Sequence, residues 1–299
     1  MTTDIIFDRQ LLVRRRARFA GTASGHEFLL VRSADDIADR LSLVRRQFHN
    51  ALVLGTYHGV LGRRLSALAN VGAVIEAEAC APLLASCAGN MRVVADEEAL
   101  PFRAASLDLV ASALSLQLVN DLPGALLQIR RALKPDGMFV GSLLGGQTLV
   151  ELRTAMLAAE AEIEGGASPR VAPFADVRDL GGLLQRAGFA LPVADADSFT
   201  VTYASALDLM RELRAMGASN ALVARRRVPV RRATRWRACE IYGEHFAAAG
   251  GRVRATFEII TLTGWAPDPS QQQPLPPGSA RTRLADALRV PEHKTDDET

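Results

Sequence analysis

Two glycines and one acid are spaced like the parts of a site for a nucleotide-like ligand. Gly55 and Gly59 lie in the segment LGTYHGVLG, directly after the apolar run ALVL at 51–54. Glycine allows the tight turn and the close backbone approach that such a ligand requires. Glu78 follows 23 residues after Gly55, where a carboxylate can accept hydrogen bonds from ribose hydroxyls. Glu76, two residues earlier in the sequence, is the alternative acceptor of these hydrogen bonds.

A second group of acids follows the apolar run that ends at residue 96. Asp96 and Glu97, with Glu98 next to them, stand where an acid can bind an adenine amino group. Acids in such places also cap helices, and strand-end carboxylates such as Glu78 can simply be exposed. Both interpretations of these acids remain open.

The elements that must position these residues alternate between strands and helices. Short apolar runs typical of strands are found at 51–54, 72–78, 91–96, 107–114 and 138–144, with helical patterns near 60–69, 82–87 and 123–133. This alternation predicts βαβ crossovers and a doubly wound, mainly parallel α/β sheet. Helices are expected at about 148–163 and 176–187, and strands at 199–203 and 255–265 that add a late antiparallel pair. In such a sheet, ligands bind beyond the carboxyl ends of the strands.

The chain divides into three expected segments. Residues 1–48 form an arginine-rich helical segment, and 49–265 form the sheet domain with a helical insertion at about 205–250. Residues 266–299 are a segment rich in Pro and Gln that ends in a flexible tail, PEHKTDDET.

Composition excludes several classes of protein. The 299 residues carry a net charge of +2, which argues against a general nucleic-acid binder. Three cysteines without a CxxC pair fit a reducing compartment. There is no apolar run long enough for a membrane span and no apolar signal core. We therefore expect a cytoplasmic protein without a transmembrane segment.

The block from Leu100 to Leu144 separates two kinds of nucleotide-like site. Its sequence, from LPF to LKPDG, resembles the middle of class I S-adenosylmethionine (SAM)-dependent methyltransferases. A nicotinamide oxidoreductase is another functional hypothesis, but it does not account for the sequence of this block. The resemblance implies a Rossmann-like sheet of the seven-stranded type, with SAM as the cofactor.

Later segments narrow the resemblance to one branch. VNDLPGALLQIRRALKPDG, LLGGQTLVELRTAMLAAEAEIEGGASPRVAPF, LMRELRAMGASNAL and ATFEIITLTGW are similar to the complex I assembly-factor branch, which includes a mitochondrial protein-arginine hydroxylase. The similarity spans about 5–288. It implies a protein substrate or assembly partner, such as a subunit of respiratory complex I, and a reaction that is either methyl transfer or arginine hydroxylation.

The resemblance also implies a set of cofactor-binding residues. They are Gly55, Thr56, Tyr57 and Gly59 in the turn, Glu78 for the ribose, Asp96 and Glu97 near the adenine, and Ser112, Ala113 and Leu114 at the end of the fourth strand. It implies no particular catalytic residue.

Three departures from the family pattern support an alternative function. Val53 replaces an acid before Leu-Gly, Tyr57 replaces the middle glycine of the turn, and Gln117-Leu118 replaces His-Trp. Tyr57 would project where the cofactor lies, at a backbone conformation that glycine adopts freely. The alternative is a non-catalytic assembly factor, a pseudoenzyme that has lost SAM binding.

The remaining polar residues predict little chemistry. The five histidines show no metal-binding spacing, so no metal site is expected. His58 is interpreted as a solvent-facing loop residue, with a ligand contact as the alternative. The arginines at 14–18 and 225–232 are either solvated helix faces or a docking surface for the partner. Association with a membrane is expected only through that partner.

Overall fold

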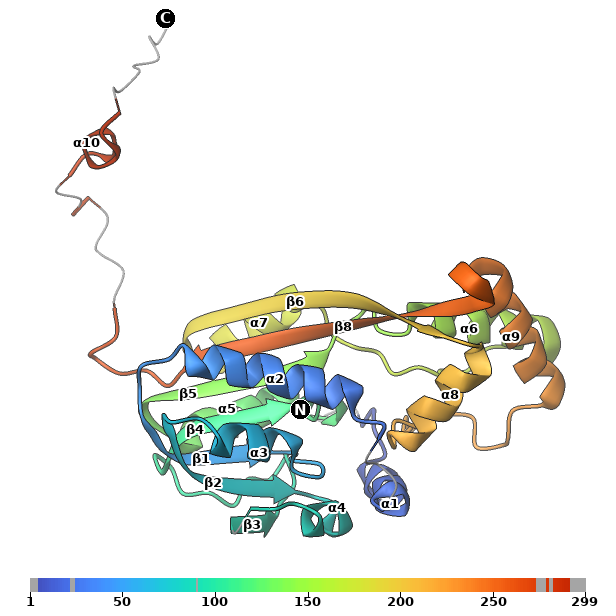
Figure 1. Cartoon of the computed structure of the whole chain (residues 1–299), viewed down its shortest axis with the longest axis horizontal. Helices are drawn as coiled ribbons and strands as arrows, with labels where there is room; N and C mark the ends of the chain where they lie inside the picture. Colours follow the sequence, from blue (N-terminus) through green and yellow to red (C-terminus); the bar gives the residue numbers. More distant parts are fainter. Residues whose placement is uncertain (1–4, 22–24, 90, 273–277, 280–281, 291–299) are drawn as a thin grey trace, which may run out of the picture. The chain divides into compact units, whose positions relative to one another are not determined.

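One mixed sheet forms the centre of the protein, with the strand order β3-β2-β1-β4-β5-β8-β6 and with β7 paired to β8 (Figure 1). This computed structural model describes residues 5–21, 25–89, 91–272, 278–279 and 282–290. By its internal contacts the chain divides into two units, 1–267 and 268–299. The first unit contains the whole sheet. The second contains α10 (Leu284–Leu288), and the predicted tail PEHKTDDET lies outside the described residues.

The parallel half of the sheet follows the predicted alternation. It contains β1 (Phe48–Leu54), β2 (Val71–Glu78), β3 (Met91–Val94), β4 (Leu107–Ala113) and β5 (Leu133–Leu144). Every residue of β4 is buried, as expected for a central parallel strand covered on both faces. The strand order reverses between β1 and β4, so the crevice for a ligand lies at their carboxyl ends.

Two long antiparallel strands complete the sheet, which confirms the predicted doubly wound α/β class. They are β6 (Ala190–Tyr203) and β8 (Arg252–Trp265), and they pair from Ala190 opposite Trp265 to Tyr203 opposite Val253. The first half of β6 was not predicted, because LPVADADS contains a proline and two aspartates. Such polar residues are typical of an edge strand, which must resist pairing with other chains.

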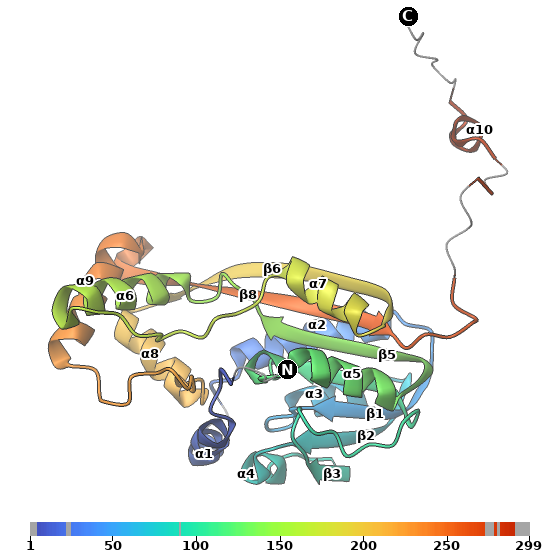
Figure 2. The ribbon, with the colours of Figure 1, turned by 180° about the vertical axis from the view of Figure 1, so that it is seen from behind.

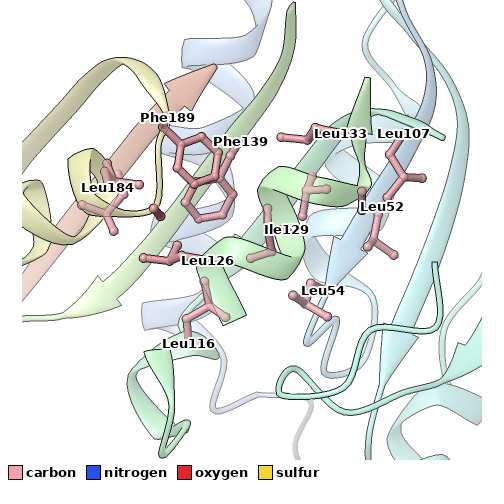
Figure 3. Packing of buried hydrophobic residues seen from close by; sticks show 14 of the residues in the cluster. Leu52, Leu54, Leu107, Leu116, Leu126, Ile129, Leu133, Phe139, Leu184 and Phe189 are labelled. Carbon is pink, nitrogen blue, oxygen red and sulfur yellow. The ribbon is translucent and has the colours of Figure 1, made fainter. Parts of the chain in front are cut away.

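Helices cover both faces of the sheet. Those of the sheet region are α2 (Phe28–Ser42), α3 (Val60–Ser66), α4 (Ala81–Ala85), α5 (Leu122–Ala132) and α7 (Val177–Arg186). Side chains of α5 and α7 pack against one face in a cluster with Leu52, Leu54 and Phe139 (Figure 3). Residues of α2 and α3 form a second cluster on the opposite face, and Figure 2 shows the two layers from behind.

A third cluster lies at the far end of the long strands. Here α6 (Val150–Glu164), α8 (Ala206–Ala215) and α9 (Arg232–His245) pack around the ends of β6 and β8. The fully buried side chains of Tyr242 and Phe257 belong to this cluster. The predicted helical insertion is therefore α8 and α9, held to the sheet by its own apolar core. The N-terminal helix α1 (Arg9–Phe19) lies beside the end of α8 (Figure 1).

Candidate functional site

The glycine turn after β1 is closely packed. Gly55 has a φ of +67°, and a Cβ at this position would lie 2.0 Å from Ser115 Oγ. Gly59 has a φ of +79° and is the N-cap residue of α3. Both positions thus require glycine, Gly55 for space and conformation and Gly59 mainly for conformation. Thr56 is buried between them, and its hydroxyl donates to Glu76.

Tyr57 occupies the middle of the turn in the left-handed region, with a φ of +58°. Its ring is partly buried, and its hydroxyl donates a hydrogen bond of 2.5 Å to the carbonyl of Met216. The guanidinium carbon of Arg16 lies 4.8 Å from the ring centroid. These contacts of the hydroxyl and the ring stabilise the left-handed backbone conformation of Tyr57, which would otherwise cost about 1–3 kcal/mol.

Glu78, at the end of β2, is the central acid of the site. Its side chain is buried and accepts hydrogen bonds of 3.0 Å from the backbone N–H groups of Tyr57 and Cys80. Arg16 Nη1 lies 3.5 Å from Glu78 Oε1. Burial raises the pKa of the Glu78 carboxyl, and the Arg16 guanidinium opposes that rise.

Glu76, the alternative acceptor, has a different environment. Its carboxylate accepts from the Thr56 hydroxyl and from the backbone N–H of Gly89, and it lines a separate hollow with Gly62 of α3. Of the two acids, Glu78 is the one that contacts Tyr57 of the glycine turn.

Asp96 and Glu97 share one partner, Arg9 of α1. Arg9 Nη2 lies 2.5 Å from Asp96 Oδ1 and also contacts the Glu97 carboxylate. Glu97 is buried and accepts a hydrogen bond from the Ser115 hydroxyl. Burial by itself would raise the pKa of Glu97, but the positive charges of Arg9 and Arg16 hold it below its usual value.

The end of β4 completes the crevice. Ser112 and Ala113 are buried within the strand, and Leu114 follows with a φ of +52°. The Ser112 hydroxyl is buried without a hydrogen-bond partner among the described residues. Leu114 lines the cavity that opens beside Tyr57.

That cavity is small and mostly apolar. Its volume is about 100 Å³, and an adjoining cavity of about 150 Å³ shares Leu12, Leu29 and Leu144 with it. Arg16, Tyr57, Leu114 and Gln117 are among its lining residues. The Tyr57 ring therefore forms part of the wall and leaves space next to it. The Oε1 atom of Gln117 is buried without a partner in the described structure.

His58 was expected to face solvent, and the structure corrects this. The side chain is 9% exposed, and its Nε2 lies against the Glu27 carboxylate at the cavity. Burial lowers the pKa of the imidazole, although Glu27 opposes that shift. This shift favours the neutral imidazole, whose Nε2–H faces the Glu27 carboxylate and whose Nδ1 is then the nitrogen that can accept a proton.

The two arginines that reach the acids were not identified as site residues from the sequence. Arg9 and Arg16 are seven positions apart on α1 with Leu12 between them, so all three lie on one helix face. This spacing is the signal that could have found them. The arginines at 225, 226 and 231 were expected on a docking surface or a solvated face, but they form ion pairs with Asp8 or Glu164.

Two kinds of feature are absent from the described residues. They contain no group of three or more His, Cys, Asp or Glu side chains arranged to hold a metal ion. Nor do they contain a helix with the length and apolar character needed to cross a membrane. Cys80 and Cys87 are buried free thiols.

Comparisons with known proteins show the family of the chain. A methyltransferase domain model matches residues 54–141, from the glycine turn to the middle of β5. The arginine hydroxylase NDUFAF5, mitochondrial, of Danio rerio is 38% identical, over 97% of this chain and 92% of its own length. The human protein is 39% identical over 95% and 84%. The chain belongs to the NDUFAF5 family.

A further relative is a methyltransferase, and a solved structure shares the fold. A malonyl-[acyl-carrier protein] O-methyltransferase of Halorhodospira halophila is 37% identical over 86% of this chain and 90% of its own. The structure of the YcgJ protein of Bacillus subtilis superposes with a TM-score of 0.54 at 13% identity, over 79% of this chain and 99% of its own. The family and fold inferred from the sequence are confirmed.

The names of the relatives overturn one expectation. The zebrafish and human NDUFAF5 proteins are named mitochondrial, which points away from the cytoplasmic location predicted above. That prediction rested on the cysteines, on the lack of a membrane span and on the lack of an apolar signal core. Mitochondrial targeting segments are amphipathic and rich in arginine, so the lack of such a core does not separate the two compartments.

Proposed function

We propose that this chain binds SAM in the crevice at the ends of β1, β2 and β4 and acts on a protein partner. The observation that carries the proposal is the buried Glu78 carboxylate at the end of β2, next to a glycine turn closed by Gly55. A ribose presents two hydroxyl donors, and a carboxylate at this place can accept both. Bound SAM supplies an activated methyl group.

The other residues fit the same cofactor. Asp96 and Glu97 provide acceptors for an adenine amino group, and Ser112, Ala113 and Leu114 border the crevice from β4. The unpartnered Ser112 hydroxyl and Gln117 amide oxygen are polar groups for which a ligand is a natural partner. Thr56, Tyr57 and Gly59 form the rest of the turn.

The relatives suggest the class of substrate. Their names specify an arginine hydroxylase and a methyltransferase that acts on a malonyl group carried by a protein. We therefore propose that the reaction is methyl transfer or arginine hydroxylation on a protein, in the assembly of respiratory complex I. His58, neutral and next to Glu27 at the cavity, is the candidate proton acceptor.

A non-catalytic assembly factor is the second candidate. The observation that favours it is that the acids already have positively charged partners. Arg16 lies beside Glu78, and Arg9 contacts Asp96 and Glu97. In this alternative the arginines permanently replace the ligand, and Tyr57 acts as a structural side chain.

Calorimetric titration with SAM separates the two candidates. The first predicts micromolar binding that Glu78→Ala abolishes, with Glu78→Gln as the conservative variant and Glu240→Ala on exposed α9 as the control. Thermal melting of each variant verifies that it is folded. No heat at millimolar SAM with the wild-type chain would contradict the proposal. Recovery of binding by Tyr57→Gly alone would identify the Tyr57 side chain as the obstacle.

A further inference from the structure

A groove between α8 and α9 is lined by arginines and apolar side chains. Its volume is about 610 Å³. The lining residues are Leu207, Met210, Arg211, Arg214, Arg232, Arg235 and Trp236. On α8, Met210 follows Leu207 by three positions and Arg214 follows Met210 by four; on α9, Arg235 and Trp236 follow Arg232 by three and four positions. Each helix therefore presents one continuous face to the groove.

The charge of this groove is not balanced by the residues that the structure describes. None of the lining residues is acidic, and Arg211 pairs with Asp208 on its own helix. Arg214, Arg232 and Arg235 are exposed and form no ion pair with any residue that the structure describes. This is unusual in a chain with nearly equal numbers of basic and acidic residues, 35 and 33.

The positive surface continues from α8 toward α1. Arg214 also lines a second hollow, with Arg15, Arg18, Phe19 and Ser219. Burial lowers the pKa of Arg15, and the like charges of Arg225 and Arg18 lower it further. Crowded cations of this kind are relieved when an anionic partner binds.

Apolar side chains in the groove indicate what kind of anion fits. Trp236 is 59% exposed, and Leu207 and Met210 are half-buried beside it. An exposed tryptophan flanked by arginines is the composition of an interface hot spot. An amphipathic acidic helix brings aliphatic groups for these side chains and carboxylates for the arginines. A nucleic-acid backbone has no aliphatic face to bury there.

The groove lies next to the candidate site. The C-terminal end of α8 leads into Met216 and Gly217, which line the cavity beside Tyr57. The Tyr57 hydroxyl is bonded to the Met216 carbonyl. A protein segment seated along α8 would thus extend to the mouth of that cavity.

We propose that the α8/α9 groove docks an acidic, amphipathic segment of the protein partner and holds it at the entrance of the site. This inference rests on the proposed function in one respect, that the partner carries the group to be modified. The segment binds through carboxylates on Arg214, Arg232 and Arg235 and through apolar contact with Trp236.

Fluorescence anisotropy with the full chain tests this docking surface. The probe is a labelled helical peptide of about 18 residues with glutamates on one face and leucines on the other. A second peptide carries lysine in place of every glutamate. We expect the acidic peptide to bind and the basic one not to bind, with weaker binding at about 300 mM than at about 50 mM salt.

Matched variants assign the binding to the groove. Arg214→Glu with Arg235→Glu should weaken binding of the acidic peptide about tenfold or more. Arg178→Glu with Arg186→Glu makes the same charge change on exposed residues of α7 and should have little effect. Equal weakening by the two double variants would overturn the proposal. Trp236→Phe should retain binding, and the blue shift of tryptophan emission on binding should disappear.

Two other ligands provide competing outcomes. A labelled single-stranded oligonucleotide and vesicles of phosphatidylserine and phosphatidylcholine are titrated under the same conditions. Groove-dependent binding of either one that exceeds binding of the acidic peptide would also overturn the proposal. Titration with SAM keeps the two proposals separate, and the Arg214→Glu/Arg235→Glu variant should still bind SAM. If the wild-type chain binds the peptide but not SAM, only the proposed function is rejected. If it binds SAM but not the peptide, only the docking surface is rejected.

Discussion

Arginines serve two regions of this protein in opposite ways. In the crevice, Arg9 and Arg16 are largely buried and lie against Glu97, Asp96 and Glu78. In the α8/α9 groove, Arg214 and Arg235 are exposed and have no acidic partner among the described residues. The same side chain is thus part of the folded structure in one region and available to a ligand in the other.

The difference teaches where charge contributes to stability and where it contributes to recognition. A buried ion pair is costly to break, because the remaining charge is left without either water or a partner. An exposed, unpaired arginine contributes little to folding, since water solvates it in both states. Substitutions in the two regions should therefore affect different measurements.

The largest effect is expected at Arg9. Arg9→Met leaves the buried Glu97 carboxylate without its cation, so the free energy of unfolding should fall by about 3 kcal/mol at pH 7. Because the pKa of Glu97 is lowered in the folded state, its stabilisation is present above its usual pKa of about 4.5 and is lost as the pH falls through the lower folded value. Urea unfolding at several pH values measures this. A difference from wild type that stays constant down to pH 3 would contradict the assignment.

Gly55→Ala should have the next largest effect. The new methyl group would meet Ser115 Oγ, and the left-handed backbone adds strain, for a loss of about 2–3 kcal/mol in unfolding free energy. Gly165→Ala, where φ is also positive but the space is open, isolates the backbone part at about 1 kcal/mol. Adding Ser115→Ala to Gly55→Ala should restore part of the loss. No recovery would mean that the contact with Ser115 is unimportant.

Tyr57→Phe should have a smaller effect. It removes the hydrogen bond to the Met216 carbonyl and leaves the ring beside Arg16, so we expect a loss of about 1 kcal/mol by chemical unfolding. His58→Gln, at the neighbouring position in the same turn, serves as a comparison. If Tyr57→Phe is as stable as wild type, the hydroxyl does not hold the turn to the end of α8.

The smallest effect on stability is expected in the groove. Arg235→Met should leave the melting temperature unchanged, because this side chain has no ion-pair partner to lose in the part of the chain that the structure describes. The same variant should weaken binding of the acidic peptide. A clear drop in melting temperature would remove the contrast between the two regions.

The sequence was sufficient for the fold because the relevant signals are local. Short apolar runs such as ALVL at 51–54 and LDLVASA at 107–113, set between helical patterns, are typical of buried strands. The start of β6 was missed because its pairing with β8 overrides a polar local sequence.

The candidate site was only partly predictable. The places of Gly55 and Glu78 follow from strand ends, which are visible in the sequence. The partnership of Arg16 with Glu78, and the burial of His58 against Glu27, depend on helices that come from distant parts of the chain. The spacing of Arg9, Leu12 and Arg16 places them on one helix face, but it does not show which part of the chain that face covers, so these contacts required the structure.

The position of α1 also has a consequence for the order of assembly during synthesis. The backbone N–H of Asp8 donates to the carbonyl of Ala221, and Phe7 forms a β-bridge with Leu222. Phe7 and Asp8, which the ribosome makes early, therefore cannot form these contacts until a segment more than 200 positions later has been made. Until then the N-terminal end of α1 lacks this anchor, whereas strands β1 to β5 precede that segment in the chain and can already pair.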